Sequence, residues 1–300
     1  MSIKADCHLH SSFSGDSKAP MPEMIDKGIS LGLKTMCFTE HNDFDYPNTE
    51  EGPGSIFLLN TDSYLYDVLR CRAKYEGKMR ILFGVELGLQ PHLADRNEDF
   101  TSAYDFDFVI GSTHLCRGMD PYYPEFFEKF SSEEEAIRAY FAETLENLKC
   151  HDDYDVLGHL DYIVRVAPNK DKNYSYDKYK DAIDPILELL VHSGKGLELN
   201  TGSFRYGLRQ PHPCTDILRR YHELGGEIIT VGTDAHKTQD VGSYLDLASE
   251  ILQLCGFKYY TIYEKRMPST SEGILREKAA MQATHRVRTF HAFIYGSFLG

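Results

Sequence analysis

The sequence predicts an α/β protein that folds as one barrel of parallel strands with helices between them. Three observations lead to this prediction: seven short apolar runs, helix-like stretches between many of them, and a possible metal ligand at the end of each run. Runs of nearly continuous apolar character are typical of parallel strands covered on both faces. Three hundred residues with 42% hydrophobic content suffice for one such barrel, so we expect a single domain.

The expected strands follow one another along most of the chain. They occupy, in order, residues 3–7, 34–39, 80–85, 106–113, 154–158, 196–197 and 227–233. A histidine, aspartate or glutamate follows each of them. Parallel strands of a closed barrel bring their C-terminal ends to one rim, where barrel enzymes have their active sites. The repeated pattern therefore predicts a single polynuclear metal site.

Amphipathic stretches between the strands predict helices over residues 22–31, 132–149, 176–192, 215–224 and 244–254. Pro22 suits a first helical turn, and Ser132 with the three glutamates after it matches a capping box. Glycines follow several of these helices as C-terminal stops. Their apolar stripes indicate faces that pack on the core. The polar, turn-rich stretch 42–63 is expected to form a loop over the active site.

The chain changes character after a last expected strand at residues 259–263. Residues 266–300 show little clean periodicity and are assigned to a C-terminal tail of uncertain structure. The expected barrel domain therefore covers residues 1–265.

Charge and cysteine content limit the possible partners and the location. A net charge of −14 argues against nucleic acid as the main partner, although bound cations would still allow a small phosphorylated substrate. Seven scattered cysteines without a CxxC pair indicate free thiols in a reducing cytoplasm. We find no export signal and no apolar run of about 18 residues, so no membrane partner is expected. The sequence does not indicate an oligomeric state.

The segment Asp6-Cys7-His8-Leu9-His10 is the most informative motif. Residues i and i+2 of a strand point to the same face, so Asp6, His8 and His10 project together. Neutral imidazoles beside a carboxylate suit zinc, iron or manganese. Two structural histidines would explain this motif alone, but the ligands at the later strand ends favour a metal site.

Seven motifs, in their order along the chain, resemble the polymerase and histidinol phosphatase (PHP) superfamily. Within it, the chain is most similar to the monofunctional histidinol-phosphate phosphatases. The motifs are Asp6-x-His8-x-His10, Thr39-Glu40-His41-Asn42-Asp43, Gly84-Val85-Glu86, Gly111-Ser112-Thr113-His114, Gly158-His159-Leu160-Asp161, Glu198-Leu199-Asn200-Thr201-Gly202 and Thr233-Asp234-Ala235-His236. The resemblance covers roughly residues 4–265. It implies a distorted (β/α)7 TIM-like barrel with three divalent metal ions (zinc, iron or manganese).

The resemblance also implies which residues bind these metals. One metal would have the ligands His8, His10, Glu86 and Asp234. Glu86 would bridge to a second metal, which His114 and His159 complete, and Asp16, His41 and His236 would bind the third. Many superfamily members have a histidine where Asp16 falls, and capping of a helix is the alternative role for this residue.

The implied reaction is hydrolysis of L-histidinol phosphate to L-histidinol and phosphate, in histidine biosynthesis. We expect in-line attack by a metal-bridging hydroxide, without a phospho-enzyme, and list Glu86, Asp161 and Asp234 as catalytic. Planar guanidinium groups match phosphate oxygens, so Arg205 and Arg165 are expected to bind the substrate. Asn42 and His212 are further substrate candidates. Asp161 has three possible roles: protonating the leaving alkoxide, binding the substrate ammonium group, or orienting His159.

Several carboxylates near the expected metal ligands could form hydrogen bonds with the ligand side chains. We expect Asp6 and Glu40 to accept hydrogen bonds from metal-bound imidazoles, and Glu198 and Asn200 either to do the same or to fill the core.

The nearest alternative function is a phosphatase of the same superfamily that acts on a nucleotide, a sugar phosphate or phosphotyrosine. A nuclease module, an amidohydrolase and a catalytically silent metal-binding barrel are the more distant alternatives.

Overall fold

Seven parallel strands form a nearly closed barrel at the centre of the computed structural model, which describes residues 3–49 and 52–271. In barrel order the strands are β1 (Ala5–Leu9), β2 (Thr35–Asn42), β3 (Arg80–Gly88), β4 (Phe108–Ser112), β5 (Val156–Leu157), β6 (Gly196–Asn200) and β7 (Ile229–Gly232). The segment after β7 returns to β1: Asp234 N–H donates to the His8 carbonyl (2.8 Å), and His10 N–H to the Ala235 carbonyl (3.0 Å). The predicted single-domain (β/α)7 barrel is confirmed.

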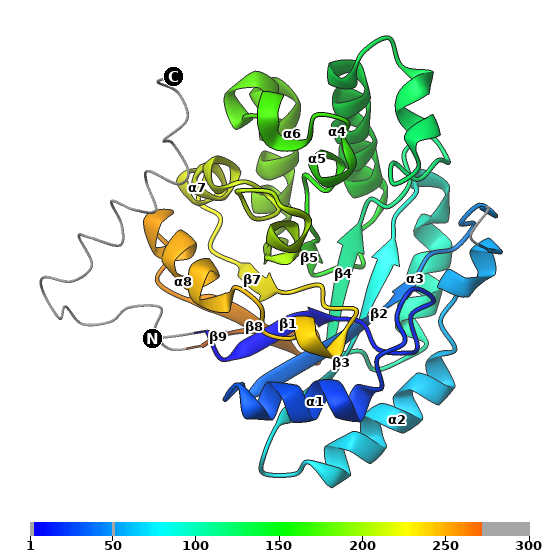
Figure 1. Cartoon of the computed structure of the whole chain (residues 1–300), viewed down its shortest axis with the longest axis vertical. Helices are drawn as coiled ribbons and strands as arrows, with labels where there is room; N and C mark the ends of the chain where they lie inside the picture. Colours follow the sequence, from blue (N-terminus) through cyan, green and yellow to red (C-terminus); the bar gives the residue numbers. More distant parts are fainter. Residues whose placement is uncertain (1–2, 50–51, 272–300) are drawn as a thin grey trace, which may run out of the picture.

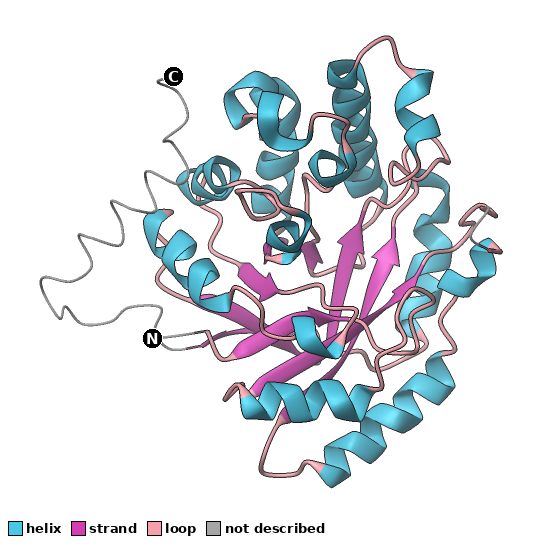
Figure 2. Ribbon diagram, viewed as in Figure 1, coloured by secondary structure: helices cyan, strands magenta, loops and turns pink. Residues whose placement is uncertain are grey.

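Helices surround the strands in Figures 1 and 2. They are α1 (Met21–Ser30), α2 (Thr61–Lys74), α3 (Ala94–Ser102), α4 (Glu133–Cys150), α5 (Ile163–Val166), α6 (Tyr176–Ser193), α7 (Thr215–Glu223) and α8 (Leu245–Leu254). The side chain of Ser132 caps α4, and Gly194 ends α6 with a left-handed φ of 69°. Helices α2 and α3 were not predicted. Both have a weak apolar stripe, because polar residues dominate their sequences.

A separate hairpin of β8 (Tyr260–Glu264) and β9 (Met267–Ser271) follows α8. It packs on the barrel through Tyr263, whose ring stacks on that of Phe108 at 5.2 Å. Arg266, in the turn between the two strands, pairs with Asp155 at 2.7 Å. The expected boundary after residue 265 thus falls inside this hairpin, and the rest of the predicted tail (272–300) lies outside the described residues.

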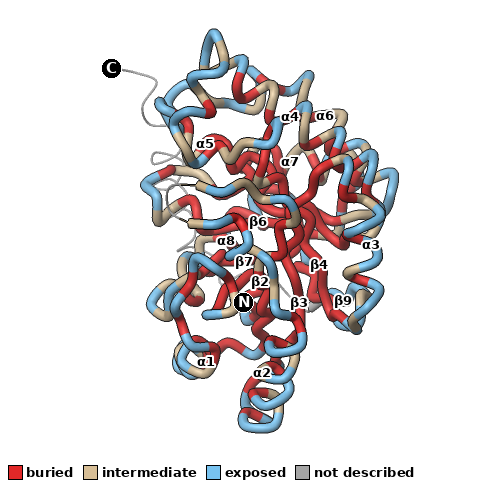
Figure 3. The backbone as a smooth tube through the Cα atoms, turned by 90° about the vertical axis from the view of Figure 1, so that its right-hand side faces the viewer, coloured by how far each residue is buried: buried red, intermediate tan, exposed pale blue. Residues whose placement is uncertain are grey.

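The core follows the strands, where the buried segments gather in Figure 3. Phe38, Phe83 and Leu197 are at most 1% exposed. Burial of each such side chain contributes about 1.5–3 kcal/mol to the stability of the barrel. All seven cysteines are free, and six of them are buried. Among the described residues, no helix has the length and apolar character needed to span a membrane.

Candidate metal centre

The nine predicted ligands lie together at the C-terminal rim of the barrel. They come from β1 and the segment after it (His8, His10, Asp16), from β2 and β3 (His41, Glu86), and from the segments after β4, β5 and β7 (His114, His159, Asp234, His236). Four overlapping groups of these side chains place three ligand atoms within 4.8 Å of one another. Such a concentration of imidazoles and carboxylates matches the ligand preferences of zinc and similar metals.

Glu86 lies at the centre of this cluster and is fully buried. Its Oε2 lies 3.1 Å from His8 Nε2, 3.3 Å from His10 Nε2 and 3.1 Å from His41 Nδ1. Its Oε1 lies 2.8 Å from His159 Nε2 and 3.2 Å from His114 Nε2. Burial opposes ionisation, but the imidazoles of His8, His114 and His41 outweigh it and hold the pKa of Glu86 well below its usual range. Each oxygen of this carboxylate faces its own group of imidazoles, which is the arrangement expected of a carboxylate that bridges two metal ions.

The hydrogen bonds of His8 and His10 test whether these residues fit a metal. His8 Nδ1 donates to Glu198 (2.6 Å). His10 Nδ1 donates to Ser14 Oγ (3.0 Å), because the Ser14 hydroxyl proton is donated to Glu40 (2.6 Å). Both Nε2 atoms therefore point into the site, where they lie 3.0 Å from each other and 3.1 Å and 3.3 Å from Glu86 Oε2. Two imidazole nitrogens and a carboxylate oxygen that converge on one point can share a cation, so the residues present fit a bound metal.

His114 gives the same result on the other side of Glu86. Its Nδ1 donates to Asp43 Oδ1 at 2.6 Å, which directs Nε2 at the Glu86 carboxylate, 3.2 Å from Oε1. The role of Asp43 was missed, although the residue belongs to the Glu40-His41-Asn42-Asp43 motif. Asp43 lies two residues after the predicted ligand His41, and this spacing could have indicated that its carboxylate contacts the metal ligands.

Asp16 joins the third group. Its Oδ2 lies 3.0 Å from His236 Nε2 and 3.6 Å from His41 Nε2. Burial opposes ionisation of the Asp16 carboxyl, but these two imidazoles outweigh burial and hold its pKa well below its usual range. The alternative role as a helix cap finds no support, because α1 begins after Pro20 without a side-chain cap.

Asp234 occupies a strained turn directly after β7, with φ at 55°. Its Oδ1 lies 3.6 Å from His10 Nε2. The buried Asp6 and the partly buried Arg205 fix this turn. Arg205 donates to the carbonyls of Thr233 (2.6 Å) and Asp234 (2.7 Å), and Asp6 accepts from the Thr233 N–H (3.0 Å) and hydroxyl (2.6 Å).

These contacts correct two expectations about the outer carboxylates. Asp6 contacts no ligand imidazole and instead fixes the Thr233 turn, where burial raises its pKa to about 6. Glu40 reaches His10 through the Ser14 hydroxyl rather than directly. Glu198 contacts a ligand imidazole: it accepts from His8 Nδ1 and also from the His159 N–H (2.9 Å). Carboxylates of this kind orient metal-bound imidazoles and raise their basicity.

The predicted substrate residues lie at the same rim but differ in their contacts. The Arg165 guanidinium is stacked between the rings of Tyr162 and Tyr206, 4.4 Å from each centroid, and its Nη1 lies 3.5 Å from Asp234 Oδ2. Arg205, in contrast, uses both Nη atoms on backbone carbonyls. Asn42 Oδ1 accepts from the Leu59 N–H (3.1 Å) and so fixes the rim loop.

Asp161 and His212 form a buried pair. His212 Nδ1 donates to Asp161 Oδ1 at 2.6 Å, and Asp161 Oδ2 accepts from the Cys214 N–H at 2.9 Å. Asp161 therefore orients His212, whereas His159 was the partner considered in the sequence analysis. His212 Nε2 is buried and has no partner among the described residues.

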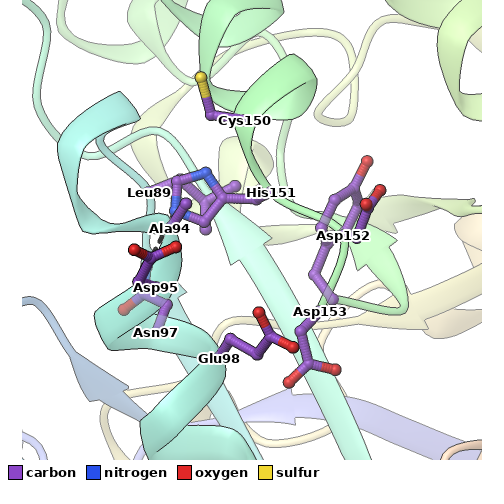
Figure 4. A pocket seen from close by; sticks show the side chains of 10 residues that line it. Leu89, Ala94, Asp95, Asn97, Glu98, Cys150, His151, Asp152 and Asp153 are labelled. Atoms are coloured by element: carbon purple, nitrogen blue, oxygen red, sulfur yellow. Dashed lines mark hydrogen bonds between the residues drawn. The ribbon is translucent and has the colours of Figure 1, made fainter.

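A small cavity of about 90 Å³ lies away from this rim, between α3 and the end of α4 (Figure 4). Its acidic residues are Asp95, Glu98, Asp152 and Asp153. His151 is held there by Asn97 (3.2 Å) and the Asn147 carbonyl (2.9 Å), and burial lowers its pKa. In the described part of the chain, the groups that could bind a metal all lie at the barrel rim.

The fold and the site together define a parallel barrel protein whose rim gathers several groups of potential metal ligands. Comparison with known families gives the more specific assignment. The family model of the PHP domain matches residues 6–202. The chain therefore belongs to the PHP domain family, as its motifs predict.

Its relatives include proteins of nearly the same length. The probable histidinol-phosphatase of Clostridium acetobutylicum is 34% identical over 265 residues, covering 87% of this chain and 97% of that protein. The histidinol-phosphatase of Lactococcus lactis subsp. lactis is 32% identical, over 85% of this chain and 92% of that protein. A crystal structure of the histidinol phosphate phosphatase from Lactococcus lactis subsp. lactis, complexed with zinc, L-histidinol and phosphate, matches with a TM-score of 0.79 at 29% identity. That match covers 89% of this chain and 98% of that one.

Proposed function

We propose that the protein is a metal-dependent phosphomonoesterase that hydrolyses L-histidinol phosphate to L-histidinol and phosphate, a step of histidine biosynthesis. The observation that carries this proposal is the buried Glu86 carboxylate, with separate imidazole sets facing its two oxygens. The relatives named histidinol-phosphatase, and the related structure complexed with zinc, L-histidinol and phosphate, support the choice of substrate.

We assign three divalent metal ions (zinc, iron or manganese) to the nine side chains. His8, His10, Glu86 and Asp234 would bind the first, Glu86 with His114 and His159 the second, and Asp16, His41 and His236 the third. The imidazole nitrogens that converge at 3.0 Å (His8 and His10) and at 3.4 Å (His41 and His236) support this assignment. When bound, such cations supply a water nucleophile of lowered pKa and neutralise charge that builds on the phosphoryl oxygens.

The protein's own side chains would position the phosphate. Arg165 is always charged, and its guanidinium plane is fixed between two tyrosine rings beside Asp234. Its free N–H groups can donate to phosphate oxygens that lie next to the metal ligands. Arg205 and Asp6 keep Asp234 in its strained turn, so they act through Asp234. Asp161 acts through His212, because its two oxygens are taken by His212 and Cys214.

We place this activity in the cytoplasm and expect no nucleic-acid or membrane partner. Seven free cysteines suit a reducing compartment. The net charge of −14 does not favour binding to a polyanion.

The experiment that tests the proposal is a comparison of phosphate release from L-histidinol phosphate, a nucleoside monophosphate, a sugar phosphate and tyrosine phosphate by the metal-loaded protein. A strong preference for L-histidinol phosphate is expected. Preference for another ester would retain the metal chemistry but reject this substrate, and no release from any ester would reject the phosphatase.

A further inference from the structure

A wall of two aromatic rings and one carboxylate stands beside the metal centre. This rim wall consists of Tyr46 and Phe57, from the segment between β2 and α2, and Asp120, from the segment after β4. The edge of Phe57 meets the His41 ring at 5.7 Å, and the Tyr46 ring packs on Phe57 at 4.5 Å. The Tyr46 hydroxyl donates to Asp120 Oδ2. The rim wall is thus connected by direct contacts to a candidate metal ligand, and each of its members is partly exposed.

Asp120 differs in its partners from the rim carboxylates that contact an imidazole. Unlike Asp6 and Glu40, which also accept only from neutral donors but are fully buried, it is partly exposed. The carboxylates of Asp16, Asp43, Glu86, Asp161, Glu198 and Asp234 each lie within 4.0 Å of an imidazole nitrogen. Asp120 accepts from the Tyr46 hydroxyl and from the Tyr122 N–H (2.8 Å), both of them neutral donors. No lysine, arginine or histidine in the described part of the chain forms an ion pair with it. A partly exposed carboxylate without an ion pair gains from a cationic ligand that removes it from water.

Asp120 lies near residues on two sides of the candidate phosphate site, the metal ligands and Arg165. It is close enough to His114 for that imidazole to affect its ionisation. It is also close enough to Tyr162 that its charge, together with burial, raises the pKa of that hydroxyl. Tyr162 in turn stacks on Arg165 and lies 5.5 Å from the His159 ring. Asp120 is thus connected to the metal ligands through Tyr46, Phe57 and His41, and Tyr162 connects the ligand His159 to Arg165.

The proposed substrate has a matching cation. In L-histidinol phosphate, the carbon next to the ester methylene bears an ammonium group and also the methylene that leads to the imidazole ring. With the phosphate at the metal ligands and Arg165, these two groups extend towards the rim. An ammonium ion beside a carboxylate forms a charge-assisted hydrogen bond, and an imidazole ring packs well on aromatic faces.

We infer that Asp120 receives the ammonium group of the substrate and that Tyr46 and Phe57 pack against its imidazole ring. This inference rests on the proposed function and makes the rim wall the determinant of substrate choice. A nucleoside monophosphate and a sugar phosphate have no ammonium group at this distance from the phosphate. The rim wall would therefore favour L-histidinol phosphate over these esters.

The variant Asp120→Asn tests the inference because an asparagine removes the charge, while its Oδ1 still accepts from the Tyr122 N–H and its amide N–H can donate to the Tyr46 oxygen. Its kcat/KM is measured with L-histidinol phosphate and with imidazolylpropyl phosphate, the analogue that lacks the amino group. We expect a loss of about 10- to 100-fold with L-histidinol phosphate, mostly in KM, and less than about twofold with the analogue. Asp45→Asn is the matched control, since Asp45 directly precedes Tyr46 in sequence but is already paired with Arg96 (2.9 Å).

The outcomes separate this inference from the proposed function. Equal losses on both esters, or no loss on either, would overturn the role of Asp120 alone. Absence of L-histidinol phosphate hydrolysis by the wild-type protein would overturn both. A second measurement needs no variant: L-histidinol is expected to inhibit the wild-type enzyme at least about tenfold more strongly than imidazolylpropanol, and equal inhibition would contradict the inference.

Discussion

His8 and His10 direct their Nε2 nitrogens at each other across 3.0 Å in the buried rim of the barrel. Glu198 fixes the proton of His8 on Nδ1, and the Glu40–Ser14 pair does the same for His10. The side chains therefore direct both Nε2 nitrogens at one point, which a proton or a metal cation can occupy. The acidic surroundings that attract a metal here also attract protons, and the two compete for the same nitrogens.

Replacing Glu86 by glutamine should reduce phosphate release by at least about a thousandfold, since one carboxylate faces two sets of ligands. We also expect bound metal to fall, because an amide bridges metals poorly. The melting temperature should change little. Metal content by mass spectrometry and phosphate release check this prediction, with Glu76→Gln, an exposed change outside the rim, as control. Near-normal activity of Glu86→Gln would refute the assigned site.

Glu198→Gln should weaken metal binding about 10- to 100-fold while the barrel remains folded, because His8 loses the carboxylate that fixes its tautomer. Asp43→Asn should do the same through His114. Competition with a chelator of known affinity measures both. If the two sites are separate, each variant loses a different metal of the set. Unchanged chelator competition in both variants would argue that these carboxylates only fill space.

Arg165 and Arg205 should respond differently to substitution by lysine. A lysine at position 165 cannot stack between Tyr162 and Tyr206 or donate through a planar fork, so inhibition by inorganic phosphate should weaken about tenfold or more. A lysine at position 205 should instead loosen the Asp234 turn and lower metal retention. Phosphate inhibition constants and metal content distinguish the two. Equal effects of both variants on phosphate inhibition would contradict the division of roles.

Metal binding should strengthen as pH rises. Burial opposes protonation of His114, but Asp43 and Glu86 outweigh it and raise its pKa to about 10. The pKa values of His41 and His236 are raised in the same way by Asp16. In the metal-free protein His114 is therefore protonated at neutral pH, and an entering metal must displace its proton. Apparent affinity should rise about tenfold per pH unit for each proton displaced.

Calorimetric titration of zinc into metal-free protein, in two buffers of different ionisation enthalpy, counts the protons released. We expect at least about one proton per chain near neutral pH. A binding enthalpy that is the same in both buffers would show that no proton is displaced.

The strand-end pattern predicted the fold and the location of the site because both follow from short segments of sequence. An apolar run followed by a ligand fixes a strand and its functional end, and the barrel then brings the ends together. The parallel register of β2 and β3, for example, places His41 opposite Glu86. Helices α2 and α3 escaped prediction because their stability comes from packing on the barrel rather than from a clear apolar stripe.

Contacts between distant loops could not be predicted in the same way. Asp6 binds the turn at Thr233, 227 positions along the chain, because the barrel closes between β1 and β7. A partner at that separation leaves no periodic signal in the sequence. The same holds for Arg205, whose donors are used by the Asp234 turn, and for Asp43, whose partner lies on the segment after β4.

Phosphate release from L-histidinol phosphate, followed as zinc, iron or manganese is added back to chelator-treated protein, tests the central claim most directly. The account predicts no turnover without metal and recovery of activity as about three metal ions bind per chain. Hydrolysis that persists in the metal-free protein, or no hydrolysis in the fully loaded protein, would contradict it.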